Sequence, residues 1–407
     1  MFRNGGRADA ILALLPIAYY NIQSTIQTGG KVSQWNDLSG NGRHAVQATA
    51  GNQMTVNATG TAAYSGKYDV SIPFDSRSFT MHLLFRRKSY NRVPTGFVFN
   101  VPTSKGGIYI QDTFGTVSVY GRSVTDKLGV LFDYDLMPVT FCFGAGALDI
   151  YIGGVRIFTG AANTANTGTI TSLFEAQTAG QPVMGGEVAQ CAMWSRALTS
   201  AEVLALHTGT GTLAVGKNVV LCVGDSISVG YKATDYAQSW RKKVADANGI
   251  VIGIIGGAGR MVSQTYSQRT NVSFTTYNRY VFFMGTNDLV NGQTFAQLRD
   301  NAILLLQYIK AQNAAAKILL VTMLPRGNGT TTPTASFESD RQLYNQWLRD
   351  NVGTYADGIV DPGADATIGE AGDSLNTTYY EGDGIHPIDA GHTILAGYIA
   401  AGLAAMG

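Results

Sequence analysis

The sequence is poor in charged residues. Lys, Arg, Asp and Glu make up 14% of its 407 residues, well below the roughly 25% that is usual in soluble domains. The formal net charge is +1, from 29 basic and 28 acidic side chains. Because no basic excess exists, electrostatic capture of nucleic acid or of an anionic membrane is not expected. Gly, Thr, Asn, Ser and Gln take the place of charge, a composition common in secreted β-rich proteins and viral fibre proteins.

Cysteines and long apolar runs are also scarce. Cys142, Cys191 and Cys222 lack zinc-ligand spacing, and their odd number argues against a disulfide framework. Each lies in an apolar, strand-like run, so buried thiols are expected. Arg3 and Arg7 precede a short apolar stretch that mimics a signal peptide. No small-residue cleavage site follows, so we expect it to be retained. No run is long enough to span a membrane.

The length of the chain predicts two domains, because it exceeds the usual size of one hydrophobic core. From about residue 60 to residue 195, short segments alternate apolar and polar residues, as in 68–74 and 79–85. Gly153-Gly154 is a hairpin signal between two such segments. Many short strands without intervening helices predict an antiparallel all-β sandwich.

The first domain is predicted to end with a short helix. Thr199-Ser-Ala-Glu202 has the form of a capping box, and the helix is expected to run to about Leu206. His207-Thr-Gly-Thr-Gly-Thr is then expected to be a flexible joint. We therefore place the first domain at residues 1–208, a linker at 209–216 and the second domain at 217–407.

In the second half, strands alternate with helical patterns. Apolar strands are predicted at 218–223, 250–255, 279–284, 317–323 and 358–360. A helical stripe begins near Tyr236, Thr294 can cap a second helix, and Phe337 to Leu348 mark a third. This alternation predicts a doubly wound α/β domain, a parallel sheet with helices on both faces. Such a sheet collects functional residues at the carboxyl ends of its strands.

Four motifs fall at those strand ends or before the last helix. They are Gly224-Asp-Ser226, Gly256-Gly-Ala-Gly259, Gly285-Thr-Asn287-Asp288 and Asp383-Gly-Ile-His386-Pro387. Acyl transfer by a serine needs a nucleophile, a base and a group that orients the base. Ser226, His386 and Asp383 can fill these roles, although a serine in such a turn can also be a helix N-cap. Asp225 and Asp288 are expected to brace loops rather than react.

A second Asp-x-x-His pair competes for the role of base. The histidines outside the second domain are His44, His82 and His207, in the first domain or the joint. Asp389-Ala-Gly-His392 has the same spacing as the fourth motif. However, Asp389 is expected to cap the last helix, and His392 lies in line with the apolar stripe of that helix. His386 with Asp383 is therefore the preferred pair.

Together the four motifs resemble the SGNH (GDSL-type) hydrolase family over residues 216–407. The resemblance implies a flavodoxin-like sheet, no metal or organic cofactor, and an oxyanion hole. Its donors would be the backbone N–H groups of Ser226 and Gly259 and the side-chain amide of Asn287. Glycine allows close backbone approach, and an amide donates without adding charge. The family usually has Asn ahead of the second-motif glycines where this chain has Ile254, so Gly257 stays open as an alternative to Gly259.

Two stretches of the first half resemble another family. Val32-Ser-Gln-Trp35-Asn-Asp37-Leu-Ser-Gly-Asn-Gly42 is similar to the opening signature of concanavalin A-like, laminin-G-type jelly rolls, and Trp194-Ser-Arg196-Ala-Leu-Thr-Ser-Ala-Glu202 to their closing strand and helix. Such domains bind carbohydrate or protein, or serve as spacers. Asp37 and Asn41 can ligate calcium or close a turn through their side chains.

The combination resembles phage tail or receptor-binding proteins, and secreted bacterial esterases. It implies a carbohydrate esterase that removes O-acetyl groups from a polysaccharide or surface glycan. Its location would be extracellular or on a virion, and a tail protein would be a homotrimer. Arg260 and Arg326 can reach a uronate or a sugar hydroxyl. Two alternatives remain open: a lipase-, thioesterase- or arylesterase-like hydrolase of small acyl esters, and a non-catalytic glycan-binding adhesin or fibre protein.

Overall fold

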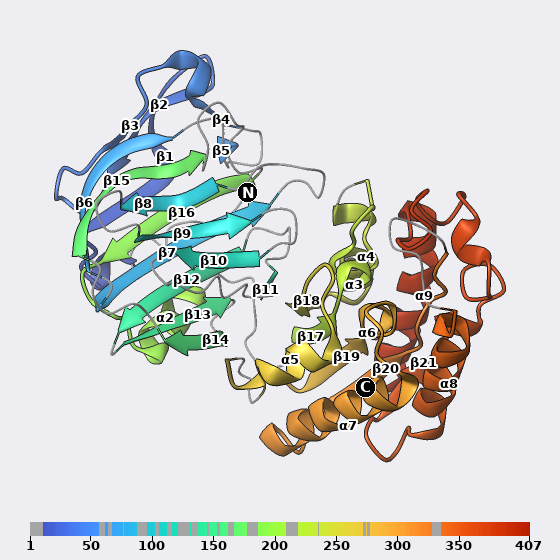
Figure 1. The fold of residues 1–407 in the computed structure, drawn as a ribbon. Coiled ribbons are helices and arrows are strands. Elements are labelled where there is room, and N and C mark those ends of the chain that lie inside the picture. The colour runs from blue at the N-terminus through green and yellow to red at the C-terminus, as the bar shows by residue number, and fades with distance from the viewer. Residues whose placement is uncertain are drawn as a thin grey trace. The chain divides into compact units, whose positions relative to one another are not determined.

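The chain separates into two compact units. The second holds Gly216–Gly407 and one short strand from earlier in the sequence, β11 (Val130–Leu131), and the first holds the rest. Figure 1 draws the antiparallel strands of the first unit in blue to green and the strands and helices that follow in yellow to red. The computed structural model describes residues 11–56, 62–63, 67–75, 77–87, 96–101, 106–111, 116–120, 130–131, 137–144, 146–152, 155–161, 167–176, 186–208, 219–234, 236–271, 274, 277–327 and 335–407.

The first unit is built from antiparallel strands, as the alternating pattern predicted. Its strands are β1 (Ala18–Thr28), β2 (Lys31–Asp37), β3 (Ala45–Val46), β4 (Met54–Val56), β5 (Ala62–Ala63), β6 (Tyr68–Asp75), β7 (Ser78–Arg87), β8 (Gly96–Val101), β9 (Gly106–Gln111), β10 (Thr116–Tyr120), β12 (Met137–Gly144), β13 (Ala147–Ile152), β14 (Val155–Ala161), β15 (Thr167–Ala176) and β16 (Gly186–Trp194). Strands β13 and β14 pair as a hairpin around Gly153-Gly154, which themselves lie outside the described residues. A jelly-roll topology stays a prediction.

Cross-strand pairs form the core of this unit. Strands β7 and β12 place Met81 opposite Phe141 and Leu83 opposite Val139, and all four side chains are buried. The other face of β7 is buried as well. There His82 is fully buried, and its ring contacts the hydroxyl of Thr140. The same hydroxyl contacts Nε2 of His207, which lies in the helix that follows β16. Strand β7 is therefore covered on both faces.

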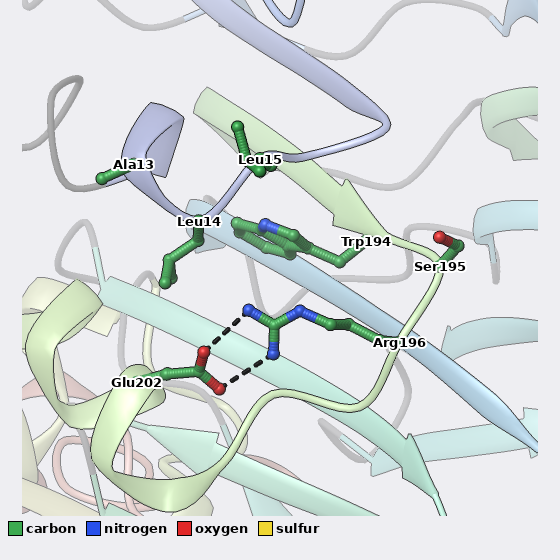
Figure 2. A pocket seen from close by; sticks show the side chains of 7 residues that line it. All are labelled: Ala13, Leu14, Leu15, Trp194, Ser195, Arg196 and Glu202. Atoms are coloured by element: carbon green, nitrogen blue, oxygen red, sulfur yellow. Dashed lines mark hydrogen bonds and ion pairs between the residues drawn. The ribbon is translucent and has the colours of Figure 1, made fainter.

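The closing signature folds as a strand, a turn and a helix, α2 (Ser200–Thr208). Glu202 forms the predicted capping box, because its N–H donates to Thr199 Oγ1 (3.2 Å) and its carboxylate accepts from Thr199 N–H (2.8 Å). Figure 2 shows the same carboxylate in two bonds with Arg196 beside Trp194, in the wall of a surface pocket. The helix continues past Leu206, so the prediction that His207 begins a flexible joint was wrong. Its side chain is buried within α2.

Asp37 and Asn41 hold a turn in the first unit. The Asp37 carboxylate accepts hydrogen bonds from the backbone N–H groups of Tyr19, Ser39 and Arg43. The Asn41 amide donates to the Ile17 carbonyl (3.2 Å). These bonds commit both side chains to closing the turn.

The three cysteines are buried, and none forms a disulfide. Their apolar surroundings predicted this. Within the part of the chain that the structure describes, no helix has both the length and the apolar character needed to cross a membrane.

The second unit is built on a parallel sheet. Its strands are β17 (Val219–Gly224), β18 (Val251–Gly256), β19 (Arg279–Phe283), β20 (Lys317–Val321) and β21 (Gly358–Val360), within a residue or two of the predicted ranges. Their order is β18-β17-β19-β20-β21, and β11 adds an antiparallel edge strand beside β18. This is the flavodoxin-like order, in which the chain changes direction around its first strand and leaves a crevice at the carboxyl ends.

Helices follow these strands, and the longer ones lie where the sequence predicted helices. They are α3 (Ser226–Val229), α4 (Trp240–Asn248), α5 (Val262–Ser267), α6 (Thr286–Val290), α7 (Phe295–Gln312), α8 (Phe337–Asp350) and α9 (Asp389–Ala405), with 3₁₀ turns at Tyr236–Gln238, Arg269–Asn271, Pro362–Ala364 and Asp373–Leu375. Helix α4 packs on α9, whereas α7 packs on α5 and α8. Thr294 caps α7 through a capping box, as expected.

Two helix starts differ from the sequence prediction. The stripe that begins near Tyr236 is divided, because the Ser239 hydroxyl accepts the Lys242 N–H and starts α4 at Trp240. Asp389 does not cap α9, since Ile388 occupies the cap position. The Asp389 carboxylate instead accepts the N–H of Thr234 (2.7 Å), in the loop after α3.

Gly256 lets strand β18 end very close to strand β17. Gly224 and Gly256 are paired in register, and Gly256 has φ of +149°. A Cβ atom on Gly256 would lie 1.6 Å from the Gly224 carbonyl oxygen, a distance that no rotamer change can relieve. The carboxyl ends of both strands therefore depend on glycine at this position.

Replacing Gly256 with alanine should destabilise the second unit by at least about 3 kcal/mol, since backbone must move and a strained φ is added. Gly253→Ala in the same strand is the matched control, because its Cβ would meet the nearest atom, Leu221 Cδ1, at 3.4 Å, an ordinary contact. Thermal unfolding followed by circular dichroism measures both. Equal midpoints for the two variants would contradict the close approach.

Candidate active site

The structure brings Ser226, His386 and Asp383 into one hydrogen-bonded chain. Ser226 is the first residue of α3, directly after β17, and its hydroxyl lies 2.8 Å from His386 Nε2 although 160 residues separate the two. His386 Nδ1 lies 2.7 Å from Asp383 Oδ2. These are the contacts that a nucleophile, its base and an orienting carboxylate require.

The carboxylate of Asp383 is fixed by its own turn. Its Oδ1 accepts the backbone N–H groups of Ile385 (2.9 Å) and His386 (3.0 Å), which leaves Oδ2 for the imidazole. Burial raises the pKa of Asp383, but hydrogen bonds and the charge of His386 lower it by a larger amount. The pKa of Asp383 in the folded protein is therefore below its usual value. An ionised Asp383 accepts Nδ1–H, and this leaves Nε2 of His386 free to accept the proton of Ser226.

His392, the competing histidine, lies in the core. Its side chain is fully buried on α9, and burial lowers its pKa to about 3. Its spacing partner Asp389 is bonded to Thr234. Since neither residue is joined to Ser226, the geometry favours the His386 pair.

Three adjacent strands carry the candidate oxyanion donors. Because β17 lies between β18 and β19, the loops that bear Ser226, Gly259 and Asn287 leave the same edge of the sheet. Among the described residues, neither Ser226 N–H nor Gly259 N–H has a hydrogen-bond acceptor. Asn287 Nδ2 donates to the carbonyl of Arg260 (3.1 Å), and its second hydrogen remains for a ligand.

The alternative glycine, Gly257, is placed differently. It is buried, and its carbonyl accepts the N–H of Arg260 (3.1 Å). Gly259 is exposed with φ of +72°, a conformation that favours glycine, and open space surrounds the position of its missing Cβ. This geometry favours Gly259 as the donor.

Two buried carboxyl groups brace the loops around the site. Asp288 accepts the N–H of Val262 at both oxygens (3.1 and 3.0 Å), which ties the third motif to the start of α5. Asp225 accepts the N–H of Ile227 (2.9 Å) and caps α3. Burial raises the pKa of Asp225 to about 7 and that of Asp288 to about 6, although backbone N–H donors oppose both shifts.

Sequence reasoning missed the residues that flank His386. The ring of Tyr231 lies edge-on to the imidazole, with centroids 4.7 Å apart. The next residue, Lys232, has φ of +76° and forms an ion pair with Glu381 (3.3 Å). No local pattern signals these contacts, because they join the loop after α3 to the turn before α9.

The two arginines that sequence analysis selected differ in their contacts. Arg260 donates to Thr265 Oγ1, to Gln268 Oε1 and to the carbonyl of Gln264, so its guanidinium is held on α5. Arg326 follows β20, and its guanidinium forms none of these hydrogen bonds. Within the described residues, no cluster of three His, Cys, Asp or Glu side chains is arranged to hold a metal ion.

The buried carboxyl of Asp288 should give stability a defined pH dependence. Its pKa is about 6 in the folded protein, above the ordinary 3.8, so the folded state binds the proton more tightly. The stability that it contributes is complete below about pH 4 and is lost as pH rises towards 6. Asp225 behaves in the same sense up to about pH 7.

Asp288→Asn should therefore flatten the decline in unfolding free energy between pH 4 and pH 6 by up to about 1.4 kcal/mol per pH unit. Urea unfolding at several pH values measures the slope. Parallel slopes for wild type and variant would show that Asp288 does not titrate in this range.

The chain is similar to several known proteins. Similar solved structures include a GDSL-like lipase from Bacteroides thetaiotaomicron (20% identity, 49% of this chain and 94% of that one, TM-score 0.39). Another is a psychrotrophic esterase from Pseudoalteromonas sp. (13% identity, 46% of this chain and 98% of that one, TM-score 0.37). A third is a Trypanosoma rangeli sialidase in complex with sialic acid (13% identity, 47% of this chain and 32% of that one, TM-score 0.36). No curated protein matches the sequence.

The sequence itself matches the family model of the GDSL-like lipases and acylhydrolases over residues 222–394. That match begins inside β17 and ends within α9, so it includes all four motifs. The second half of the chain thus contains a GDSL-like lipase/acylhydrolase domain, and membership of this family implies a carboxylic ester hydrolase.

Proposed function

We propose that the protein is a serine esterase that removes O-acyl groups, O-acetyl groups above all, from a polysaccharide. The observation that carries the proposal is the chain of contacts from Ser226 Oγ through His386 to Asp383. Each atom lies within hydrogen-bond reach of the next, as proton transfer from the serine hydroxyl to the imidazole requires.

The first step forms an acyl-enzyme. Ser226 Oγ attacks the ester carbonyl carbon while His386 Nε2 takes the hydroxyl proton, and Asp383 stabilises the imidazolium. The carbonyl π electrons move to oxygen, which then carries a negative charge. When they return, the bond to the sugar oxygen breaks, and the sugar leaves with the proton from His386.

The second step releases the acid. Water loses a proton to His386 and attacks the acyl-enzyme carbonyl. The bond to Ser226 Oγ then breaks, and the serine regains its proton from His386. In both steps the oxyanion would accept hydrogen bonds from Ser226 N–H, Gly259 N–H and the Asn287 amide. Donors that are in place before substrate binds would need little reorganisation during the reaction.

The polysaccharide part of the proposal is supported by the first unit. Its antiparallel strands and its two signatures fit a concanavalin A-like module that would bind the glycan on which the esterase acts. The neutral polar composition fits an extracellular or virion-associated protein, and a tail protein would form homotrimers. Neither nucleic acid nor membrane insertion is part of this proposal.

One observation favours a second candidate, a hydrolase of longer acyl esters. Leu375 is 66% exposed, and its side chain packs over Gly327. Gly327 N–H in turn donates to the carbonyl of Gly384, beside Asp383 (2.7 Å). An exposed leucine so close to the triad turn could contact an apolar acyl chain.

Hydrolysis of p-nitrophenyl acetate, butyrate and octanoate distinguishes the two. The acetylesterase predicts kcat/KM highest for acetate, and Ser226→Ala should lower kcat by at least about a thousandfold. Ser228→Ala is the matched control, because Ser228 Oγ lies in the same helix but contacts the carbonyl of Phe283 (3.4 Å). It should retain activity.

Faster turnover of octanoate would replace the acetylesterase with the longer-chain hydrolase. Ester turnover that survives in Ser226→Ala, or that is absent in wild type, would overturn the serine mechanism. Acetate release from O-acetylated polysaccharide by wild type then tests the substrate class.

A further inference from the structure

Within the part of the chain that the structure describes, no contact neutralises the charge of Arg326. The residue is half-buried in the loop after β20, and its Nε is buried without a hydrogen-bond partner. Among the described residues, no hydrogen bond or ion pair involves its two terminal nitrogens, which are not buried. By contrast, Lys232 is paired with Glu381 and the Arg260 guanidinium is held by three acceptors.

The backbone beside Arg326 is joined to the triad turn. Gly327 N–H donates to the Gly384 carbonyl (2.7 Å), and Gly384 follows Asp383. Burial lowers the pKa of Arg326, and the charges of Asp225 and Asp383 oppose this shift. The guanidinium is thus within electrostatic range of the two carboxyl groups that flank the bond between Ser226 and His386.

Neither carboxyl group contacts the guanidinium. Asp383 is engaged with His386 and with the N–H of Ile385, and Asp225 with the N–H of Ile227. A half-buried cation without a contacting anion is costly, because water is partly removed and no charge replaces it. An anion that arrives with the substrate would remove this cost.

We infer that Arg326 binds a carboxylate group of the substrate beside the scissile ester, so that the enzyme prefers O-acetylated acidic sugars. The planar guanidinium suits a carboxylate, since two parallel N–H groups can meet its two oxygens. This inference rests on the proposed esterase function and names the substrate class of the same site. Arg260 is not assigned this role, because its guanidinium is held on α5.

The test compares two matched substrates, the mono-O-acetyl methyl glycosides of glucuronic acid and of glucose. They differ by a carboxylate in place of a hydroxymethyl group. Wild type should release acetate from the glucuronoside with the higher kcat/KM. Arg326→Gln should lose about ten- to a hundredfold on the glucuronoside, the range for a charge-assisted hydrogen bond, and little on the glucoside or on p-nitrophenyl acetate.

Two further variants separate substrate binding from other effects. Arg326→Lys keeps the charge but not the planar fork, so it should retain part of the preference. Arg299→Gln is the matched control on the surface of α7, where the arginine pairs with Asp300, and should behave as wild type. Equal losses on both sugars in Arg326→Gln would show that the arginine acts through Asp383 and would overturn the inference. The inference would also be overturned if wild type showed no preference for the glucuronoside over the glucoside.

A binding experiment is independent of turnover. Methyl glucuronoside and methyl glucoside are titrated into Ser226→Ala, with and without Arg326→Gln, and followed by NMR. Binding of the glucuronoside should be the tighter and should weaken about tenfold or more when Arg326 is replaced. If wild type hydrolyses no ester but this difference appears, the esterase function fails and the carboxylate site stands. If esters are hydrolysed and the difference is absent, only the carboxylate site fails.

Discussion

The candidate site depends on the place of strand β17 inside the parallel sheet. Because β18 and β19 pair on either side of it, the three loops that carry the first three motifs leave the sheet together. Gly256 allows the end of β18 to approach the backbone of Gly224 in β17 more closely than any side chain at that position would permit. The serine after β17 therefore lies at the edge of the sheet from which the loops that bear Gly259 and Asn287 also leave.

Buried carboxyl groups hold these loops and lower stability at neutral pH. Asp225 and Asp288 accept backbone N–H groups in surroundings that raise their pKa values. A protein selected for stability alone would not need acidic groups at these positions. Their geometric effect explains them better: Asp288 fixes the start of α5 relative to Asn287, and Asp225 fixes the first turn that presents Ser226. Precise placement of donors is what stabilisation of an oxyanion requires.

Much of this could be predicted from the sequence, and the limits have physical causes. The apolar strands of the second unit have a strong pattern because both their faces are buried, and their ranges were found within a residue or two. Residues after strands β17, β18 and β19 could be placed together because a parallel sheet aligns carboxyl ends. The cap of α9 was assigned wrongly to Asp389, since local sequence does not show that Thr234 competes for its carboxylate.

Contacts between distant segments could not be found in the same way. The edge-on packing of Tyr231 against His386 and the unneutralised charge of Arg326 depend on how three loops meet. The helix after β16 also continued past its predicted end, because His207 is buried against Thr140 rather than exposed in a joint. Tertiary packing determines each of these features, and no periodic pattern in the sequence indicates them.

The most direct test is covalent capture of the nucleophile. Wild type would be incubated with p-nitrophenyl diethyl phosphate, and the site of the diethylphosphoryl group located by peptide mass spectrometry. An activated Ser226 predicts one phosphoryl group on that serine, together with loss of esterase activity and far slower labelling of His386→Ala. Labelling of another residue, or equal labelling of Ser226 with and without His386, would contradict the mechanism.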